Sequence, residues 1–218
     1  MVDSASRPQD AAPSVVLADL GLGNLRSVER ALQRAGGRVQ TTADPALIRD
    51  AERLVVPGQG SFRDGAVAAA GAVGAAVLSF LERGRPYLGI CLGMQLLFEK
   101  SEEAPGAQGF GVLKGEVVRF PPPVEAGHPG ARLKVPHMGW NQVRSTHPYI
   151  DDQSWYYFVH SYYCVPADKR LVVGETEYGL PLCTAVARGS IFACQFHPEK
   201  SHRAGRKLLR TFLEAPCS

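Results

Sequence analysis

The sequence lacks the features that mark secreted, membrane-spanning and nucleic-acid-binding proteins. Its first ten residues contain acids and a proline but no apolar core, so we expect no secretory signal. The longest uncharged stretch, residues 65–81, is rich in alanine and glycine and is shorter than the roughly 18–20 strongly apolar residues of a membrane span. The net charge is only +3 and the 24 lysines and arginines are scattered, so a nucleic-acid partner is not expected.

Cysteine is scarce and irregularly spaced. The odd number, five, and the absence of any Cys-x-x-Cys pair argue against a disulfide framework and against a zinc site. We therefore predict reduced thiols, no bound metal and a cytoplasmic location. Cys183 and Cys194 fall within strand-like runs, and we interpret them as small buried hydrophobic residues.

Nucleotide-binding motifs are also missing. No P-loop is present, and the turn that contains Gly21 and Gly23 lacks the third glycine of a dinucleotide fingerprint because residue 26 is arginine. We interpret this turn as a tight connection between a strand and a helix, and we predict no cofactor.

In the first hundred residues, short apolar runs typical of strands alternate with segments whose apolar residues recur at helical spacing. Helices are predicted to begin at Asn24 and Asp44, to run unbroken from Phe62 to Phe80 with Val67 facing the core, and to cover residues 94–99. Strands alternating with helices predict a parallel sheet with helices on both faces. The predicted strands are residues 14–20, 38–41, 53–56 and 86–90.

The second half of the sequence is rich in strand-like runs joined by short turns. We predict a single α/β domain with a mostly parallel central sheet, flanking helices and additional antiparallel strands in the C-terminal half. Residues 1–13 are predicted to form a mobile tail, residues 14–215 the domain, and residues 121–130 a surface loop. The later strands are expected at 112–120, 142–144, 154–163, 171–178, 182–187 and 191–196, before a helix over 202–214.

The segment Gly89-Ile90-Cys91-Leu92-Gly93 lies between an apolar strand and a helical stretch. In this context G-x-C-x-G is the thiol form of a nucleophile elbow, and its glycines remove side chains that would clash in the turn. The thiol would stand over a helix amino terminus, which favours the thiolate, with the Leu92 N–H facing a developing oxyanion. We therefore predict that Cys91 is a nucleophile, with a buried structural cysteine as the alternative.

A second segment supplies the base that such a thiol needs. Gln195-Phe196-His197-Pro198-Glu199 follows another apolar strand, and histidine transfers protons near neutral pH. His197 and Glu199 are two residues apart, so in an extended segment both side chains lie on the same side. We predict that the Glu199 carboxylate orients His197, and that the free ring nitrogen faces Cys91.

These two segments resemble the signatures of class I (triad) glutamine amidotransferases. Residues 19–28, 136–141 and 158–162 narrow the resemblance to glutaminase subunits of imidazole glycerol phosphate synthases, over residues 14–214. The resemblance implies that Cys91 attacks the side-chain amide of glutamine. It also implies that His197 moves the proton and that Glu199 orients His197.

The resemblance also assigns the surrounding residues. A backbone N–H from the loop with Gly58 and Gln59 would join that of Leu92 in the oxyanion hole after a peptide flip, although the family more often has a small aliphatic residue at position 59. Glutamine would be bound by Gly60, Gln95, Ser161 and Tyr162, the last two of which have a purely structural strand role as the alternative. We interpret His137 and His160 as packing or hydrogen-bonding residues.

Nothing in the sequence suggests a site for a phosphorylated imidazole precursor. The resemblance therefore implies a heterodimer with a (β/α)8-barrel cyclase that uses the ammonia in histidine biosynthesis. The alternatives are a glutaminase of anthranilate, pyridoxal phosphate or GMP synthesis, a standalone γ-glutamyl cysteine hydrolase, and a non-catalytic module. The candidate partner interface comprises Asn24, Pro136, His137, Met138, Trp140 and Lys200.

Overall fold

A ten-stranded sheet forms the centre of the computed structural model, which describes residues 12–121 and 134–217. Its order is β2-β1-β3-β4-β12-β11-β9-β6-β5, and β10 pairs with β11. The first five strands in this order are mutually parallel, and their continuous apolar runs are buried on both faces except at the edge strand β2. They are β2 (Arg38–Thr42), β1 (Ser14–Ala18), β3 (Leu54–Gly58), β4 (Tyr87–Cys91) and β12 (Ile191–Cys194).

The remaining strands of this sheet are mostly antiparallel, which confirms the predicted fold class. β11 (Pro181–Arg188) pairs antiparallel with β12, with β10 (Val172–Glu177) and with β9 (Tyr162–Pro166). Next to β9 lies β6 (Gly115–Arg119), which is antiparallel to β9 and parallel to the short β5 (Lys100–Ser101). A separate antiparallel pair, β7 (His137–Val143) and β8 (Ser154–His160), forms a second sheet.

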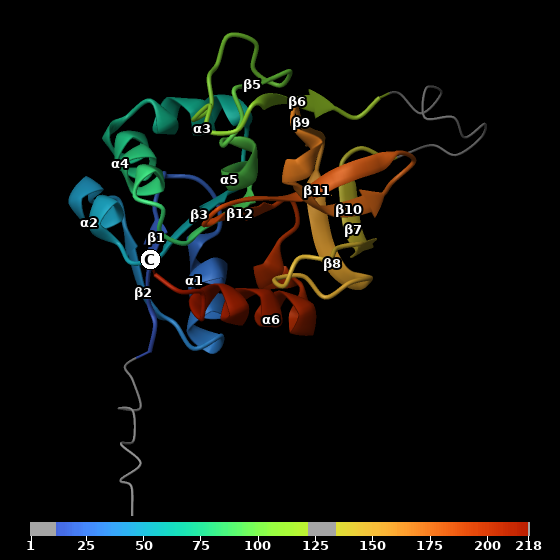
Figure 1. The fold of residues 1–218 in the computed structure, drawn as a ribbon. Helices are drawn as coiled ribbons and strands as arrows, with labels where there is room; N and C mark the ends of the chain where they lie inside the picture. The colour runs from blue at the N-terminus through green and yellow to red at the C-terminus, as the bar shows by residue number, and fades with distance from the viewer. Residues whose placement is uncertain (1–11, 122–133, 218) are drawn as a thin grey trace, which may run out of the picture.

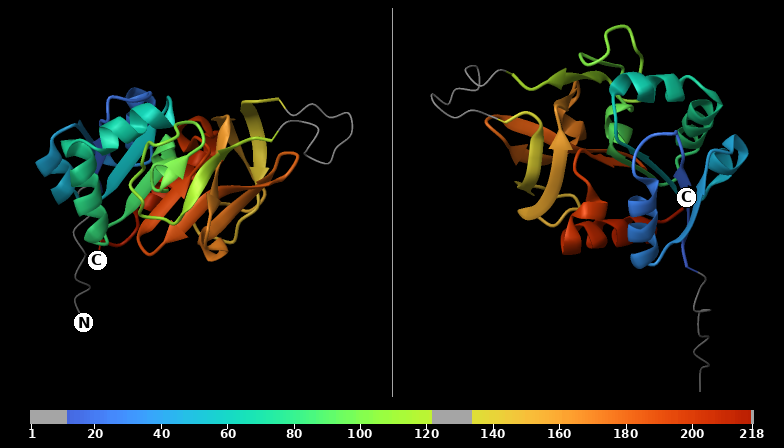
Figure 2. Two further views of the ribbon diagram at one scale, coloured as in Figure 1. Left: turned by 90° about the horizontal axis from the view of Figure 1, so that it is seen from above. Right: turned by 180° about the vertical axis from the view of Figure 1, so that it is seen from behind.

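Helices cover both faces of the parallel strands (Figure 1). α2 (Pro45–Asp50), α3 (Phe62–Ala69) and α4 (Ala72–Glu82) pack into one apolar core, and α1 (Leu25–Arg34) and α6 (His202–Leu213) pack into the other. Alternate residues of β1 divide between the two cores: Val16 joins the first, whereas Val15 and Leu17 join the second. The β7–β8 pair closes the second core, and Figure 2 shows it on the strand-rich side of the molecule.

The alanine-rich region forms two helices, so the prediction of one unbroken helix is wrong. α3 ends at Ala69 and α4 begins at Ala72, with the two axes bent by 77°. Gly71 caps α4 in an extended conformation, with φ −87° and ψ −175°. A Cβ atom at Gly74 would lie 1.9 Å from the Ala69 carbonyl oxygen, so glycine allows the second helix to pack against the end of the first.

The faces of these helices also differ from the prediction. Val67 is 71% exposed, because a position five residues after the buried Phe62 lies on the other side of an α-helix. Among the described residues, no single helix is long and apolar enough to cross a membrane, and α3 and α4 reach that length only as a bent pair.

Three elements have boundaries that differ from the prediction, because hydrogen bonds between distant segments decide where these elements begin and end. α5 (Leu92–Gln95) is a single turn rather than a helix over 94–99, because the Leu96 and Leu97 carbonyls accept hydrogen bonds from Phe110 and Leu113. The strand predicted at 154–163 divides at Ser161 into β8 and β9, which belong to different sheets. β7 covers 137–143 rather than 142–144.

The predicted tail and surface loop fall almost wholly outside the described residues. Cys194 is fully buried as predicted, whereas Cys183 is only partly buried. All five cysteines lie within the described residues, and none forms a disulfide. β4 ends at Cys91, and the neighbouring parallel strand β12 ends at Cys194, three residues before His197. The segments that carry Cys91 and His197 therefore leave the sheet side by side.

Candidate active site

The Cys91 turn has the geometry of a nucleophile elbow. Cys91 ends β4 with φ 56° and ψ −107°, a strained conformation for a residue with a side chain, and α5 begins at the next residue. A Cβ atom at Gly89 would lie 2.7 Å from the Gly93 carbonyl oxygen, and one at Gly93 would lie 1.9 Å from the Val56 carbonyl oxygen. Both glycines are therefore required by close backbone approach, as the sequence predicts.

His197 and Glu199 form a buried pair beside this turn. The chain leaves β12 at Cys194, which pairs with Ile90 of β4, and reaches His197 three residues later. The His197 Nδ1 and Glu199 Oε1 atoms are 2.8 Å apart, and both side chains are buried. The predicted contact is present, but its route differs: η2 (Pro198–Lys200) is a 3₁₀ turn rather than an extended segment.

The surroundings of His197 hold a proton on the ring. Burial acts to lower its pKa, but interactions with the Cys91 sulfur and the Glu199 carboxylate outweigh burial and raise the pKa to about 10. Among the described residues, no contact to Nε2 has the geometry of a full hydrogen bond, so this nitrogen is left for the interaction with the Cys91 sulfur. The ring is thus fixed at Nδ1 and free to exchange a proton at Nε2, the arrangement that general acid–base catalysis needs.

Replacing Glu199 with glutamine is expected to lower the His197 pKa, because the charge that stabilises the imidazolium is lost while the side-chain shape is kept. We expect turnover to fall by about 10²–10⁴-fold, the usual contribution of acid–base catalysis. NMR titration of the His197 ring and a pH profile of kcat/KM measure the two effects. Glu214→Gln, a change of an exposed carboxylate at the C-terminal cap of α6, is the control. An unaltered His197 titration in Glu199→Gln would contradict the role of the carboxylate.

Cys91 and His197 open into one cavity of about 400 Å³. The cavity collects most of the residues expected around a bound substrate, and Gly58 lies just outside it, paired with Cys91 in the sheet. The predicted members are Gln59, Gly60, Leu92, Gln95, Ser161 and Tyr162, and the additional members are Glu103, Pro136, Val159, His160 and Lys200.

More than nine-tenths of the chain matches known proteins. The family model described as glutamine amidotransferase class-I matches residues 16–215. The chain belongs to this family. Similar relatives include the proteins named imidazole glycerol phosphate synthase subunit HisH of Dechloromonas aromatica, Aromatoleum aromaticum and Syntrophotalea carbinolica. They are 49%, 48% and 45% identical and cover 94%, 91% and 91% of this chain and 97%, 97% and 98% of their own lengths.

Solved structures agree on the fold. A crystal structure of a glutamine amidotransferase has a TM-score of 0.71 at 22% identity and covers 92% of this chain and 97% of its own. The structure of PurLQS from Thermotoga maritima has a TM-score of 0.73 at 20% identity and covers 94% of this chain and 99% of that chain. At these identities the likeness establishes the fold alone.

Two residues of this amidotransferase site were missed by the sequence analysis. Gln195 is fully buried, and its Nε2 lies 3.5 Å from the Cys91 Sγ. Its position two residues before His197 is a signal that could have identified it, because alternate residues of a strand-like segment are expected on one side. Glu103 lies after β5, lines the cavity and accepts a hydrogen bond from the Phe62 N–H at 2.7 Å. No local motif marks Glu103.

Gln95 lies in the cavity wall, as expected. Its hydrogen bonds determine which of its side-chain atoms is available to a bound molecule. Its Nε2 donates to the Tyr162 carbonyl at 3.3 Å and to the Gln195 Oε1 at 3.1 Å. An amide nitrogen carries two hydrogens, so both are used. The Gln95 side chain therefore offers an acceptor, its carbonyl oxygen, to a bound molecule.

His137 and His160 pack inside the amidotransferase, as predicted. Their Nδ1 and Nε2 atoms are 3.1 Å apart, and His160 Nδ1 lies 2.8 Å from the Tyr162 carbonyl oxygen. Burial lowers the pKa of His137 to about 4 and that of His160 to about 3, so both rings are neutral. His137 is only 2% exposed and stacks between Phe158 and Tyr178. It faces the interior side of β7, which favours a packing role, and its placement in a partner interface stays a prediction.

The other residues assigned to the interface lie at or near the surface. Met138 and Trp140 project from the outer face of β7 and are 61% and 41% exposed. Trp140 stacks on His202 at 4.9 Å between ring centroids. Asn24 is exposed and caps α1 by accepting a hydrogen bond from the Ser27 N–H. Pro136 and Lys200 border the cavity that contains Cys91.

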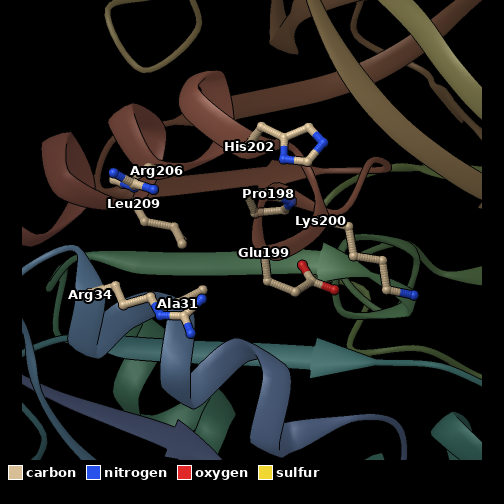
Figure 3. Close-up of a pocket in the computed structure, with 8 residues that line it drawn as sticks. All are labelled: Ala31, Arg34, Pro198, Glu199, Lys200, His202, Arg206 and Leu209. Carbon is tan, nitrogen blue, oxygen red and sulfur yellow. The ribbon is translucent and has the colours of Figure 1, made fainter.

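A second hollow borders η2 and shares Lys200 with the cavity of Cys91 (Figure 3). Arg34 of α1 and Arg206 of α6 lie on the helices that flank it, and Glu199 and Lys200 come from the turn between them. Neither Cys91 nor His197 lines this hollow, so it is distinct from the cavity of the nucleophile. Among the described residues, no three His, Cys, Asp or Glu side chains are grouped so as to hold a metal ion.

Proposed function

We propose that this amidotransferase is the glutaminase subunit of an imidazole glycerol phosphate synthase, which hydrolyses glutamine and passes the ammonia to a cyclase subunit. The observation that carries the glutaminase activity is the single cavity that joins Cys91 to the buried His197–Glu199 pair. The assignment to this synthase is supported by relatives named as its HisH subunit, at 45–49% identity over more than nine-tenths of the chain.

The first half of the reaction makes a thioester. The Cys91 sulfur attacks the side-chain carbonyl carbon of glutamine, and the electron pair of the C=O bond moves to oxygen. The Leu92 N–H and a flipped peptide N–H at Gly58–Gln59 stabilise this oxyanion. As the C–N bond breaks, His197 donates its Nε2 proton to the departing nitrogen, and ammonia leaves.

The second half restores the enzyme. Water attacks the thioester carbonyl, and His197 Nε2 takes a proton from that water. The bond between sulfur and carbon then breaks, the sulfur leaves as thiolate, and glutamate is released. The imidazolium beside the thiolate is thereby re-formed, which agrees with the raised pKa of His197.

The cavity walls suit the amino-acid end of glutamine. The carbonyl oxygen of Gln95 accepts from the α-ammonium group, and the Glu103 carboxylate supplies opposite charge. Gly60, Ser161 and Tyr162 meet the remaining backbone atoms of the substrate. The side-chain amide then points towards Cys91, as attack requires.

The partner surface is formed by the exposed part of β7 together with the rim of the cavity. Met138 and Trp140 are large, exposed and apolar, and Pro136 and Lys200 connect them to the cavity. A surface of this kind seals the route of ammonia from water. The occupant is a (β/α)8-barrel cyclase, and the pair forms a heterodimer. The cytoplasmic location stays a prediction.

Trp140→Ala is expected to weaken binding of the cyclase by at least about 30-fold, the effect of losing an interface residue worth roughly 2 kcal/mol. Calorimetric titration of the two purified subunits measures this change. The matched control is Trp155→Ala, which removes an exposed tryptophan of β8 that is not assigned to the interface. Equal affinity of Trp140→Ala and wild type would remove this residue from the contact surface.

A glutaminase assay with and without the cyclase and its ligand tests the assignment. We expect low turnover alone and stimulation by the liganded partner, because the loop at Gly58–Gln59 has to flip its peptide before it donates to the oxyanion. Equal turnover in both conditions would count against the assignment. Deletion of the gene should give a requirement for histidine. A requirement for tryptophan, pyridoxal or guanine instead would identify one of the other glutaminases.

A further inference from the structure

A chain of buried amide groups runs beneath the nucleophile. The Gln195 Nε2 lies 3.5 Å from the Cys91 sulfur, and the Gln195 Oε1 accepts from the Gln95 Nε2 at 3.1 Å. The Gln95 Nε2 also donates to the Tyr162 carbonyl at 3.3 Å. This is a geometrically defined hydrogen bond to the Cys91 sulfur, which also interacts with the His197 ring.

The direction of this chain follows from its far end. The Tyr162 carbonyl oxygen can only accept, so Gln95 must turn its NH₂ group towards it. The same NH₂ group reaches the next side chain, so the Gln195 atom beside it must be the acceptor, Oε1. Gln195 is then left with its NH₂ group facing the sulfur. The Tyr162 carbonyl of β9 thus fixes the orientation of both amides, and the Gln195 NH₂ group donates to the Cys91 sulfur.

A donor at this position favours the ionised form of the thiol. A thiolate accepts a hydrogen bond more strongly than a neutral thiol, and the Gln195 side chain is fully buried, so water does not compete for its N–H group. The contact with Gln195 adds to the interaction of the sulfur with His197, whose ring has to move a proton during turnover.

We propose that Gln195 is a positioning residue that stabilises the Cys91 thiolate and fixes the sulfur against the wall of the glutamine cavity. The inference rests on the proposed role of Cys91 as nucleophile. Because Gln195 is also hydrogen-bonded to Gln95, the position of the sulfur is fixed relative to the wall that binds the substrate. Loss of Gln195 therefore lowers the thiolate fraction at neutral pH, and loss of Gln95 does so more weakly because the Gln195 amide can then rotate.

Alkylation by iodoacetamide across a range of pH values tests the proposal without any glutamine turnover. The modified peptides are quantified by mass spectrometry, so that Cys91 is followed separately from the exposed Cys217, which serves as an internal reference. In Gln195→Met we expect the Cys91 rate at pH 7 to fall by about 3–10-fold, the effect of one neutral hydrogen bond, with its pH profile displaced upward. The Cys217 profile should not change.

Two further variants keep the test decisive. Gln195→Glu preserves the shape but places a carboxylate beside the sulfur, so its rate should fall at least as far as that of Gln195→Met. Gln40→Met, a change of an exposed glutamine on the edge strand β2, should behave as wild type. Thermal melts identify the variants that fold. An unchanged pH profile of Cys91 alkylation in either folded Gln195 variant would overturn the proposal. If the profile is displaced but the wild-type protein does not hydrolyse glutamine, the proposal is supported and only the proposed function is refuted.

Discussion

Cys91→Ala is expected to reduce glutaminase turnover by at least about 10³-fold, even with a saturating cyclase partner. Removing the nucleophile leaves only substrate binding and the oxyanion hole, and triads in other hydrolases lose activity on this scale. Steady-state release of glutamate measures the effect. Cys91 is one of two groups that raise the pKa of His197, so the same substitution should also lower that pKa. NMR titration of the His197 ring measures this change.

The control for this substitution is Cys217→Ala. Cys217 is the exposed cysteine of the described chain, its Sγ donates to the Glu52 carbonyl at 3.5 Å, and it does not line the cavity of Cys91, so its removal should leave turnover unchanged. Cys91→Ala should still bind glutamine, because the Gln95 and Glu103 side chains remain in the cavity. Residual turnover above a tenth of the wild-type rate in Cys91→Ala would show that another group attacks the amide.

Gly93→Ala is expected to destabilise the protein by about 3 kcal/mol or more, at the upper end of the effects of overpacking. The added methyl group would lie 1.9 Å from the Val56 carbonyl oxygen, which belongs to the neighbouring strand β3 and cannot move without breaking the sheet. Denaturant unfolding measures the loss. Glutaminase activity should fall as well, because any relief of the clash displaces the Cys91 turn.

Gly71→Ala is the matched control for that experiment. Gly71 has an ordinary φ of −87°, and the nearest atom to an added methyl group is the Ala68 carbonyl oxygen at 3.4 Å. Its free energy of unfolding should change by less than about 1 kcal/mol, the usual range for a helix N-cap. If Gly93→Ala were as stable as Gly71→Ala, the elbow would not depend on the close approach of β3.

Local sequence signals were sufficient where neighbouring residues determine the structure. The elbow could be predicted because Gly89 and Gly93 flank Cys91 between an apolar strand and a helix start. The His197–Glu199 contact could be predicted from a separation of two residues, although the actual 3₁₀ turn differs from the extended geometry assumed. In both cases the interacting groups lie within one turn of chain.

Sequence signals failed where distant segments determine the outcome. Alanine and glycine favour helix throughout residues 62–82, and the bend at Gly71 depends on packing between α3 and α4. His137 follows an exposed proline, but a shift of one residue along β7 separates buried from exposed side chains, and the register with β8 decides it. Glu103 enters the cavity from a loop that carries no motif.

The central claim is that the Cys91 sulfur attacks the side-chain carbon of glutamine. Labelling with a glutamine analogue that carries a diazoketone in place of the amide tests it most directly, because the label bonds to the attacking atom. Intact-mass and peptide analysis should find one adduct per chain, on Cys91, whose formation slows in Glu199→Gln and is blocked by glutamine. An adduct on any other residue, or none on a preparation that hydrolyses glutamine, would contradict the account.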